Sequence, residues 1–251
     1  MKFFFIHLFS YLYSKSSTFI ENFFFKKKTT YSSLIETGFY KDRLQFKSNF
    51  SDFIEKKLAQ NIFFEKLIIR EKYIKDLINN IFVLNGIKDK LHDLTGFNYS
   101  VDFFLVYSTY NIGQSNVEKD IYANHWHKDK PFSQNTLKII IPISEISEDH
   151  GPMEIMSIKD SNKINFSSNL RNINPTNQLK LIGTEDDVFF FLPNLCYHKA
   201  GNPSAGKKRS QIMLQLNPSN KWRYSNDLYK KQYLIEPKFP IFNLNDKYKL
   251  I

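Results

Sequence analysis

Residues 187–198 read DVFFFLPNLCYH, a short aromatic and β-branched run that ends in a turn and a histidine. Runs of this kind are typical of buried β-strands. Three more occur in the chain: VDFFLVY at 101–107, LKIIIPI at 137–143 and RSQIMLQL at 209–216. Turn residues separate them, notably Asn111-Ile112-Gly113, His150-Gly151-Pro152 and Gly201-Asn202-Pro203. Short strands with no helices between them predict a β-sandwich or barrel over residues 99–217.

The chain before this region is predicted to be mostly helical, over residues 1–98. Residues 51–84 carry apolar side chains at helical spacing, and Asn85-Gly86 ends that pattern. We expect residues 218–251 to form a C-terminal extension that covers the barrel. All 251 residues are therefore predicted to form a single domain.

The first residues form a separate apolar segment, FFFIHLFSYLY at 3–13. The segment is too short to span a bilayer, which needs about 20 residues. We expect an amphipathic helix that packs on the body of the protein. Peripheral membrane contact, helped by Lys26 to Lys28, is the less favoured alternative.

Composition narrows the class of protein. The 25 Phe and 14 Tyr provide enough apolar surface for a core, and the single Cys196 excludes a disulfide scaffold. One free cysteine fits the reducing cytoplasm, where we expect the protein to be located. The 35 basic and 25 acidic residues give a net charge of +10. Nucleic-acid binders more often gather basic residues on one element, and here they are spread along the chain, so we expect no nucleic-acid partner.

The densest group of chemically reactive side chains is Asn124-His125-Trp126-His127-Lys128-Asp129. On a strand, residues two apart point to the same face, so His127 and Asp129 would converge. Two histidines and one carboxylate on one face of a metal ion are typical of non-haem Fe(II) oxygenases. The third ligand has to come from elsewhere. His198, which follows a predicted strand, is the best candidate because the other histidines lie among helices or before a turn.

Arg209 opens the last predicted strand, and Gln211 shares its face. A guanidinium inside a small barrel is costly unless it binds an anion, and its planar fork suits a carboxylate. The anion that we infer is the distal carboxylate of 2-oxoglutarate. Lys138 and Lys208 are the next candidates for this role.

Further residues could surround the site. His125 could contact a metal ligand or the substrate, or it could be an ordinary histidine of the barrel interior. Asn124, Tyr107 and Gln211 could face the cosubstrate or the substrate. Cys196 and Trp126 are predicted to be core residues.

These features resemble the phytanoyl-CoA dioxygenase family of Fe(II)- and 2-oxoglutarate-dependent oxygenases. The matching parts are His127-x-Asp129, Leu137 to Ile143 ahead of Gly151-Pro152, Gly183 with Asp187 to Leu192, His198, Asn202 and Arg209. The resemblance covers residues 100–217 and implies a mainly β double-stranded β-helix, the cupin-like jelly roll, with N-terminal helices. It implies that His127, Asp129 and His198 hold Fe(II) and that Arg209 holds 2-oxoglutarate.

The activity implied is a dioxygenase reaction with O2 and 2-oxoglutarate as cosubstrates. It would hydroxylate a small molecule, anionic or linked to a lipid or sugar, and release succinate and CO2. The sequence departs from the family in its short gap between Asp129 and His198 and in Lys128, where many relatives carry Gln. Both departures leave the substrate undetermined.

Two other classes remain open at this point. Residues 193–202 (PNLCYHKAGN) resemble the second cupin motif, so a cupin-type metal enzyme or binding protein that does not use 2-oxoglutarate is the alternative. That interpretation gives Arg209 no ligand. A metal-free barrel would leave two histidines, an aspartate and an arginine inside the protein without partners.

Overall fold

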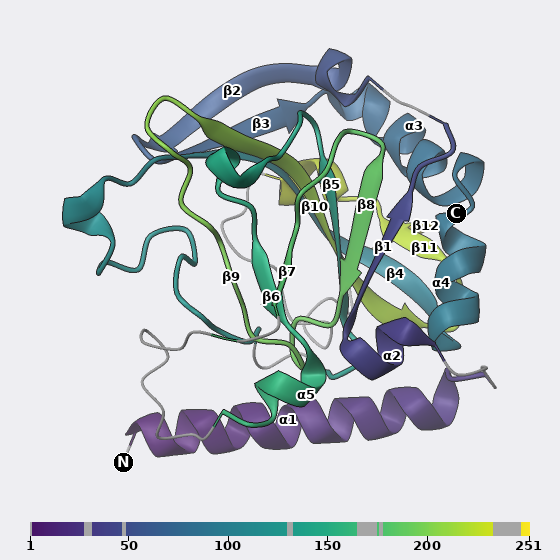
Figure 1. Cartoon of the computed structure of the whole chain (residues 1–251). Coiled ribbons are helices and arrows are strands. Elements are labelled where there is room, and N and C mark those ends of the chain that lie inside the picture. Colours follow the sequence, from purple (N-terminus) through teal and green to yellow (C-terminus); the bar gives the residue numbers. More distant parts are fainter. Residues whose placement is uncertain are drawn as a thin grey trace.

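Two β-sheets form the centre of the computed structural model (Figure 1). The structure describes residues 2–27, 32–46, 49–129, 133–164, 175, 178–232 and 247–251. The larger sheet has the strand order β1-β8-β5-β10-β4-β11-β12, and the β2–β3 hairpin joins it through β4. The smaller sheet has the order β7-β6-β9.

The strands of the larger sheet are β1 (Phe39–Arg43), β2 (Ile54–Asn61), β3 (Phe64–Ile69), β4 (Asn98–Tyr110), β5 (Leu137–Pro142), β8 (Asp187–Phe191), β10 (Lys208–Ser219), β11 (Arg223–Ser225) and β12 (Tyr248–Leu250). Those of the smaller sheet are β6 (Glu154–Met156), β7 (Gln178–Lys180) and β9 (His198–Lys199). The helices are α1 (Lys2–Phe24), α2 (Ser33–Thr37), α3 (Ile74–Asn79), α4 (Ile87–Thr95), α5 (Ile158–Ser161) and α6 (Leu228–Lys231). A π-helical turn, Asn80–Leu84, continues α3.

The four apolar runs of the sequence become β4, β5, β8 and β10. The predicted mainly β jelly roll is therefore confirmed, with two sheets that do not close into a barrel. Along β10, successive side chains point to opposite faces of the larger sheet. Ile212, Leu214 and Leu216 of β10 belong to one apolar cluster with residues of α3 and α4. Arg209 and Gln211 occupy odd-numbered positions of the same strand and therefore face the opposite side of the sheet, toward the space between the sheets.

The helical prediction is wrong for residues 54–69, which form the β2–β3 hairpin. Phe53, Ile54, Leu58 and Ile62 match a helical period, but β3 pairs with β4 and lengthens the main sheet. The pairing of β3 with β4, and of β2 with β3, outweighs the high helix propensity of the Lys, Ala and Gln residues of β2. The helical prediction holds for α3 and its π turn, and Asn85-Gly86 ends that helix as expected.

The two ends of the chain lie against the sheets. α1 packs on the body of the protein, as predicted, through Ser14, Thr18 and Glu21. Within the C-terminal extension, β11 adds to β4 in parallel and β12 pairs with β11. Lys28 and residues 233–246, which belong to the predicted basic run and extension, lie outside the described residues. None of the helices described is long and apolar enough to cross a bilayer.

Candidate metal centre

Backbone hydrogen bonds bring the three predicted metal ligands to one place. His127 and His198 form an isolated antiparallel bridge, in which each backbone N–H donates to the other residue's carbonyl at 3.0 Å. The Asp129 N–H donates to the Pro193 carbonyl at 3.0 Å. The segment around His127 is thus a short bridge and not the regular strand that the sequence predicts. It still directs His127 and Asp129 toward the same side.

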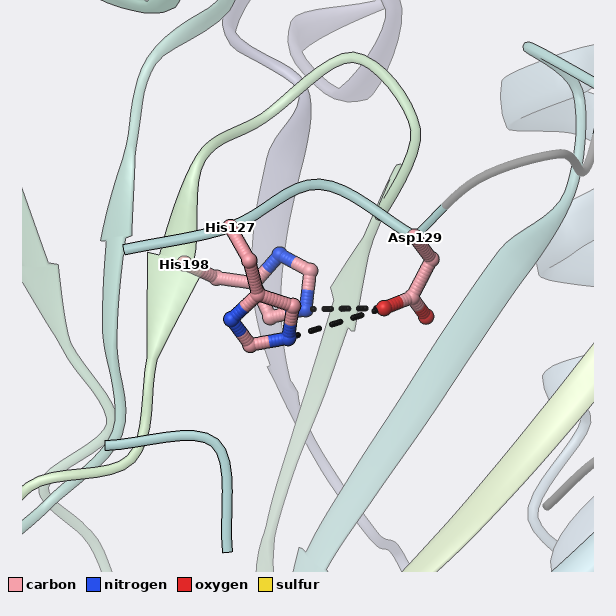
Figure 2. A group of neighbouring side chains, drawn as sticks. All are labelled: His127, Asp129 and His198. Atoms are coloured by element: carbon pink, nitrogen blue, oxygen red, sulfur yellow. Dashed lines mark ion pairs between the residues drawn. The ribbon is translucent and has the colours of Figure 1, made fainter. Parts of the chain in front are cut away.

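The three side chains converge, as Figure 2 shows. The Asp129 Oδ1 atom lies 3.4 Å from His198 Nε2 and 3.7 Å from His127 Nε2. All three ligand atoms lie within 4.8 Å of one another. Metal–ligand bonds of about 2 Å separate two ligand atoms of one ion by about 3 to 4 Å. The separations therefore leave room for an ion between the three side chains.

The histidine tautomers suit metal binding. His127 Nδ1 lies 2.8 Å from the His125 carbonyl, and His198 Nδ1 lies 3.1 Å from the Cys196 carbonyl. A carbonyl only accepts hydrogen bonds, so each Nδ1 carries the proton and each Nε2 keeps its lone pair. His198 Nε2 is buried without a hydrogen-bond partner in the described structure. A bound metal would satisfy that nitrogen, so the residues fit the ion that the fold implies.

Charges around the carboxylate favour the metal-binding protonation states. Burial lowers the pKa of His127 to about 4, so its imidazole is neutral near pH 7. Burial alone would raise the pKa of the Asp129 carboxyl. The ammonium group of Lys138, whose Nζ contacts Asp129 Oδ2, outweighs burial and holds that pKa well below its usual range. With Oδ2 held by Lys138, Oδ1 is the oxygen directed at both histidines.

Arg209 lies fully buried at the start of β10, as the sequence predicts. Its Nη1 donates to the carbonyls of Gly151 and Gly201. Its Nε and Nη2 are buried with no hydrogen-bond partner in the described residues. Two unpaired nitrogens on one guanidinium form the fork that binds a carboxylate through two parallel hydrogen bonds.

A cavity of about 610 Å³ lies beside the ligands. His127 and His198 line it from one side, and Tyr107 of β4 lines it from another. The Tyr107 hydroxyl accepts a hydrogen bond from Gln211 Nε2, and its ring stacks on Phe64 at 5.3 Å between centroids. Tyr107 therefore lines the cavity, and Gln211 contacts its hydroxyl without lining the cavity itself.

Two of the predicted neighbours, Asn124 and His125, do not line the cavity. Asn124 does not line the cavity: its Oδ1 accepts from the Ile121 N–H and its Nδ2 donates to the Val117 carbonyl, so the side chain holds that loop. His125 contributes its carbonyl to His127, and its ring is absent from the cavity wall. Lys208 is exposed, whereas Lys138 lines the cavity.

The two residues predicted to belong to the core do so. Cys196 and Trp126 are both buried. Burial raises the pKa of the Cys196 thiol to about 12, so this thiol is not a thiolate ligand near neutral pH.

Sequence reasoning missed most of the residues that line the cavity, among them Tyr122, Phe64 and Lys66. Tyr122 lines the cavity, and its hydroxyl donates to the Tyr110 carbonyl at 2.9 Å. It has a positive φ of 41° next to Ala123 at 62°, a backbone turn with no sequence signal such as glycine. Phe64 and Lys66 also line the cavity. They were missed because their segment is predicted to be a helix, which hides the pairing of β3 with β4.

Comparisons with known proteins support the fold. No protein-family model and no curated protein sequence matches the chain. Among solved structures, the chain is similar to SnoN, described as a non-heme alpha ketoglutarate dependent epimerase from nogalamycin biosynthesis. The match has 14% identity and a TM-score of 0.53, over 74% of this chain and 78% of SnoN. A second SnoN structure, in complex with Fe3+, alpha ketoglutarate and nogalamycin RO, matches at 10% identity with a TM-score of 0.54, over 86% of this chain and 95% of SnoN. This likeness shows a shared fold.

Proposed function

We propose that this protein is an Fe(II)- and 2-oxoglutarate-dependent oxygenase, as the resemblance to the phytanoyl-CoA dioxygenase family implies. The observation that carries the proposal is the group His127, Asp129 and His198, in which two bare imidazole nitrogens and one carboxylate oxygen face a common point. The set of two nitrogens and one oxygen suits Fe(II) with positions left open. SnoN, which has the same fold, is described in complex with Fe3+ and alpha ketoglutarate.

Each residue has a role in this proposal. His127, Asp129 and His198 hold the iron, and Lys138 keeps Asp129 Oδ2 away from it. Arg209 binds the distal carboxylate of 2-oxoglutarate, because its Nε and Nη2 are buried and unpaired. When bound, Fe(II) and 2-oxoglutarate supply the activation of O2 for oxidation of a C–H bond, with succinate and CO2 as products. The need for an anion beside Arg209 favours this proposal over a cupin-type protein without 2-oxoglutarate.

The substrate that we propose is a small anionic molecule, and the outcome we propose is hydroxylation. Lys66 lines the cavity, and Phe64, Leu105 and Met213 give it apolar walls. Such a lining suits a molecule with an apolar body and at least one negative group. We also propose a cytoplasmic location, which the single free cysteine supports.

Substrate-dependent succinate formation tests the proposal. The protein is incubated without O2 with Fe(II), 2-oxoglutarate and a metabolite extract, and O2 is then admitted. We expect succinate to form faster with the extract than without it, and one extract component to gain an oxygen atom. His198→Ala should abolish both signals, whereas His92→Ala, which changes a histidine of α4 outside the site, should retain them. Equal succinate formation by both variants would contradict the proposal.

A further inference from the structure

The outward side of α1 is largely apolar between Leu8 and Phe24, with Lys15, Ser16 and Asn22 as exposed polar residues among the apolar ones. Figure 1 shows the helix along one edge of the molecule, with no described element beyond it. Phe19 and Phe23 are 72% and 74% exposed. Apart from Tyr11, the exposed large hydrophobic residues of α1, which we call its outer face, are Leu8, Phe9, Leu12, Phe19, Ile20, Phe23 and Phe24. An apolar patch this long on a protein surface marks a docking site.

The inward side of α1 is polar, the reverse of an ordinary surface helix. Ser14 Oγ accepts from Asn194 Nδ2 at 3.0 Å, and Thr18 Oγ1 accepts from the Gln134 N–H at 2.8 Å. Glu21 Oε2 accepts from the Ser133 hydroxyl at 2.6 Å. These hydrogen bonds fix the rotation of the helix about its axis. The apolar arc therefore cannot turn inward without breaking them, so its exposure is built into the packing.

The charges beside the outer face are positive. Lys15 on the helix and Lys26 and Lys27 just after it are exposed. The one acidic residue of α1 is Glu21, which is directed inward. An apolar helix face with basic residues around it and no outward acid is complementary to an anionic lipid surface.

We propose that α1 docks this protein on an anionic membrane surface, with its axis parallel to the bilayer plane and its outer face among the lipids. The exposed apolar residues run from Leu8 to Phe24 and give a contact about 25 Å long. A two-fold copy of the chain fits this face less well. It would place two surfaces that each carry Lys15, Lys26 and Lys27 in one interface, in a protein of net charge +10. A convex helix also enters deformable lipid without needing a matching groove.

Docking through α1 leaves the candidate active site accessible. The β2–β3 hairpin contributes Gln60, Asn61 and Phe64 to the cavity wall. In Figure 1 this hairpin lies at the side of the molecule opposite α1. A bilayer bound to the outer face would not cover the hairpin. The inference is therefore independent of the proposed function.

Vesicle co-sedimentation of the full-length protein tests the inference. The probes are vesicles of phosphatidylcholine alone and of phosphatidylcholine mixed with phosphatidylglycerol. We expect binding to the mixed vesicles that weakens as salt rises. The double variant Phe19→Ser/Phe23→Ser should bind at least about a hundredfold more weakly, because two large apolar side chains no longer enter the lipid. Phe46→Ser is the matched control, since Phe46 is an exposed phenylalanine outside α1.

The results of these experiments distinguish a lipid membrane from a second copy of the chain as the binding partner of the outer face. Binding by the wild type and by Phe46→Ser, with loss in the double variant at an unchanged Tm, supports membrane docking. Absence of wild-type binding, or equal binding by the double variant, overturns it. Sedimentation velocity without lipid gives the third result: a wild-type dimer that the double variant does not form would assign the outer face to a second copy and also overturn the proposal.

Discussion

Replacing Arg209 by methionine should stabilise the ligand-free protein while abolishing 2-oxoglutarate binding. The guanidinium is fully buried, and its Nε and Nη2 have no hydrogen-bond partner in the described structure. Each unsatisfied buried donor costs about 1–3 kcal/mol. Methionine removes both donors and keeps a similar length, although it leaves the carbonyls of Gly151 and Gly201 without Nη1. We expect a net gain of about 1–4 kcal/mol, as found when buried charges are replaced by apolar residues.

Thermal unfolding measures both effects. A gain of this size should raise the Tm of the metal-free Arg209→Met variant by roughly 2–16 °C, because 1 kcal/mol shifts the Tm of a protein of this length by about 2–4 °C. With Ni²⁺ in place of Fe²⁺ to prevent turnover, 2-oxoglutarate at a hundred times its Kd should stabilise the wild type by about 2.7 kcal/mol. The variant should show no such shift.

The Arg209→Lys variant tests whether 2-oxoglutarate binding depends on the positive charge alone or also on the planar shape of the guanidinium. Lysine keeps the buried charge but not the fork, so it should bind 2-oxoglutarate about ten- to a hundredfold more weakly and gain no stability. The reasoning is refuted if Arg209→Met unfolds at a lower temperature than the wild type and still responds to 2-oxoglutarate. That result would mean that Arg209 supports the fold and that the carboxylate binds elsewhere.

The remaining predictions concern the surroundings of the metal ligands and two packing contacts. Lys138→Met should lower metal affinity about 10- to 100-fold, measured by competition with a chelator, because Asp129 loses the group that holds its Oδ2; unchanged affinity would remove Lys138 from this role. Burial raises the pKa of Glu21 from 4.5 to about 7, so the folded state holds this proton more tightly than the unfolded state. Below pH 4.5 the Glu21 carboxyl is protonated in both states, and its burial does not lower the free energy of unfolding. As pH rises from 4.5 through about 7, the free energy of unfolding falls by at most about 3 kcal/mol. Urea unfolding of Glu21→Gln should lack this fall, and a parallel pH profile for both proteins would contradict the prediction. Gly38 has a φ of +87°, and a methyl group there would collide with neighbouring side chains, so Gly38→Ala should cost about 2–5 kcal/mol. Gly86→Ala, with φ of +65° and open space around it, should cost only about 1–2 kcal/mol, and equal losses would refute the steric argument.

The sequence predicts those parts of the fold that depend on local pattern. Residues 101–107 and 187–192 become buried strands because aromatic and β-branched side chains there pack on both faces of a sheet. The metal ligands follow from the same logic. Residues two apart share a face on any extended segment, so His127 and Asp129 converge even on a single bridge.

Features that depend on tertiary contacts are not visible in the local sequence. Residues 54–69 have a helical pattern, but the free edge of β4 recruits them as strands. The helical period of Phe9, Leu12, Phe19 and Phe23 correctly indicates an amphipathic helix, but not which side faces the protein. The hydrogen bonds of Ser14, Thr18 and Glu21 decide that orientation, and their partners are distant in the sequence.

The central claim, that three side chains hold Fe(II) in a site that also receives 2-oxoglutarate, is tested most directly by an anaerobic titration. Fe(II) is added to the protein with and without 2-oxoglutarate, and the metal-to-ligand charge-transfer absorption is followed. We predict that the wild type binds one iron and shows the band only when 2-oxoglutarate is present. Asp129→Ala should show neither the iron nor the band, because two histidines remain without the carboxylate. A wild-type protein that binds no iron, or an Asp129→Ala variant with an unchanged band, would contradict the claim.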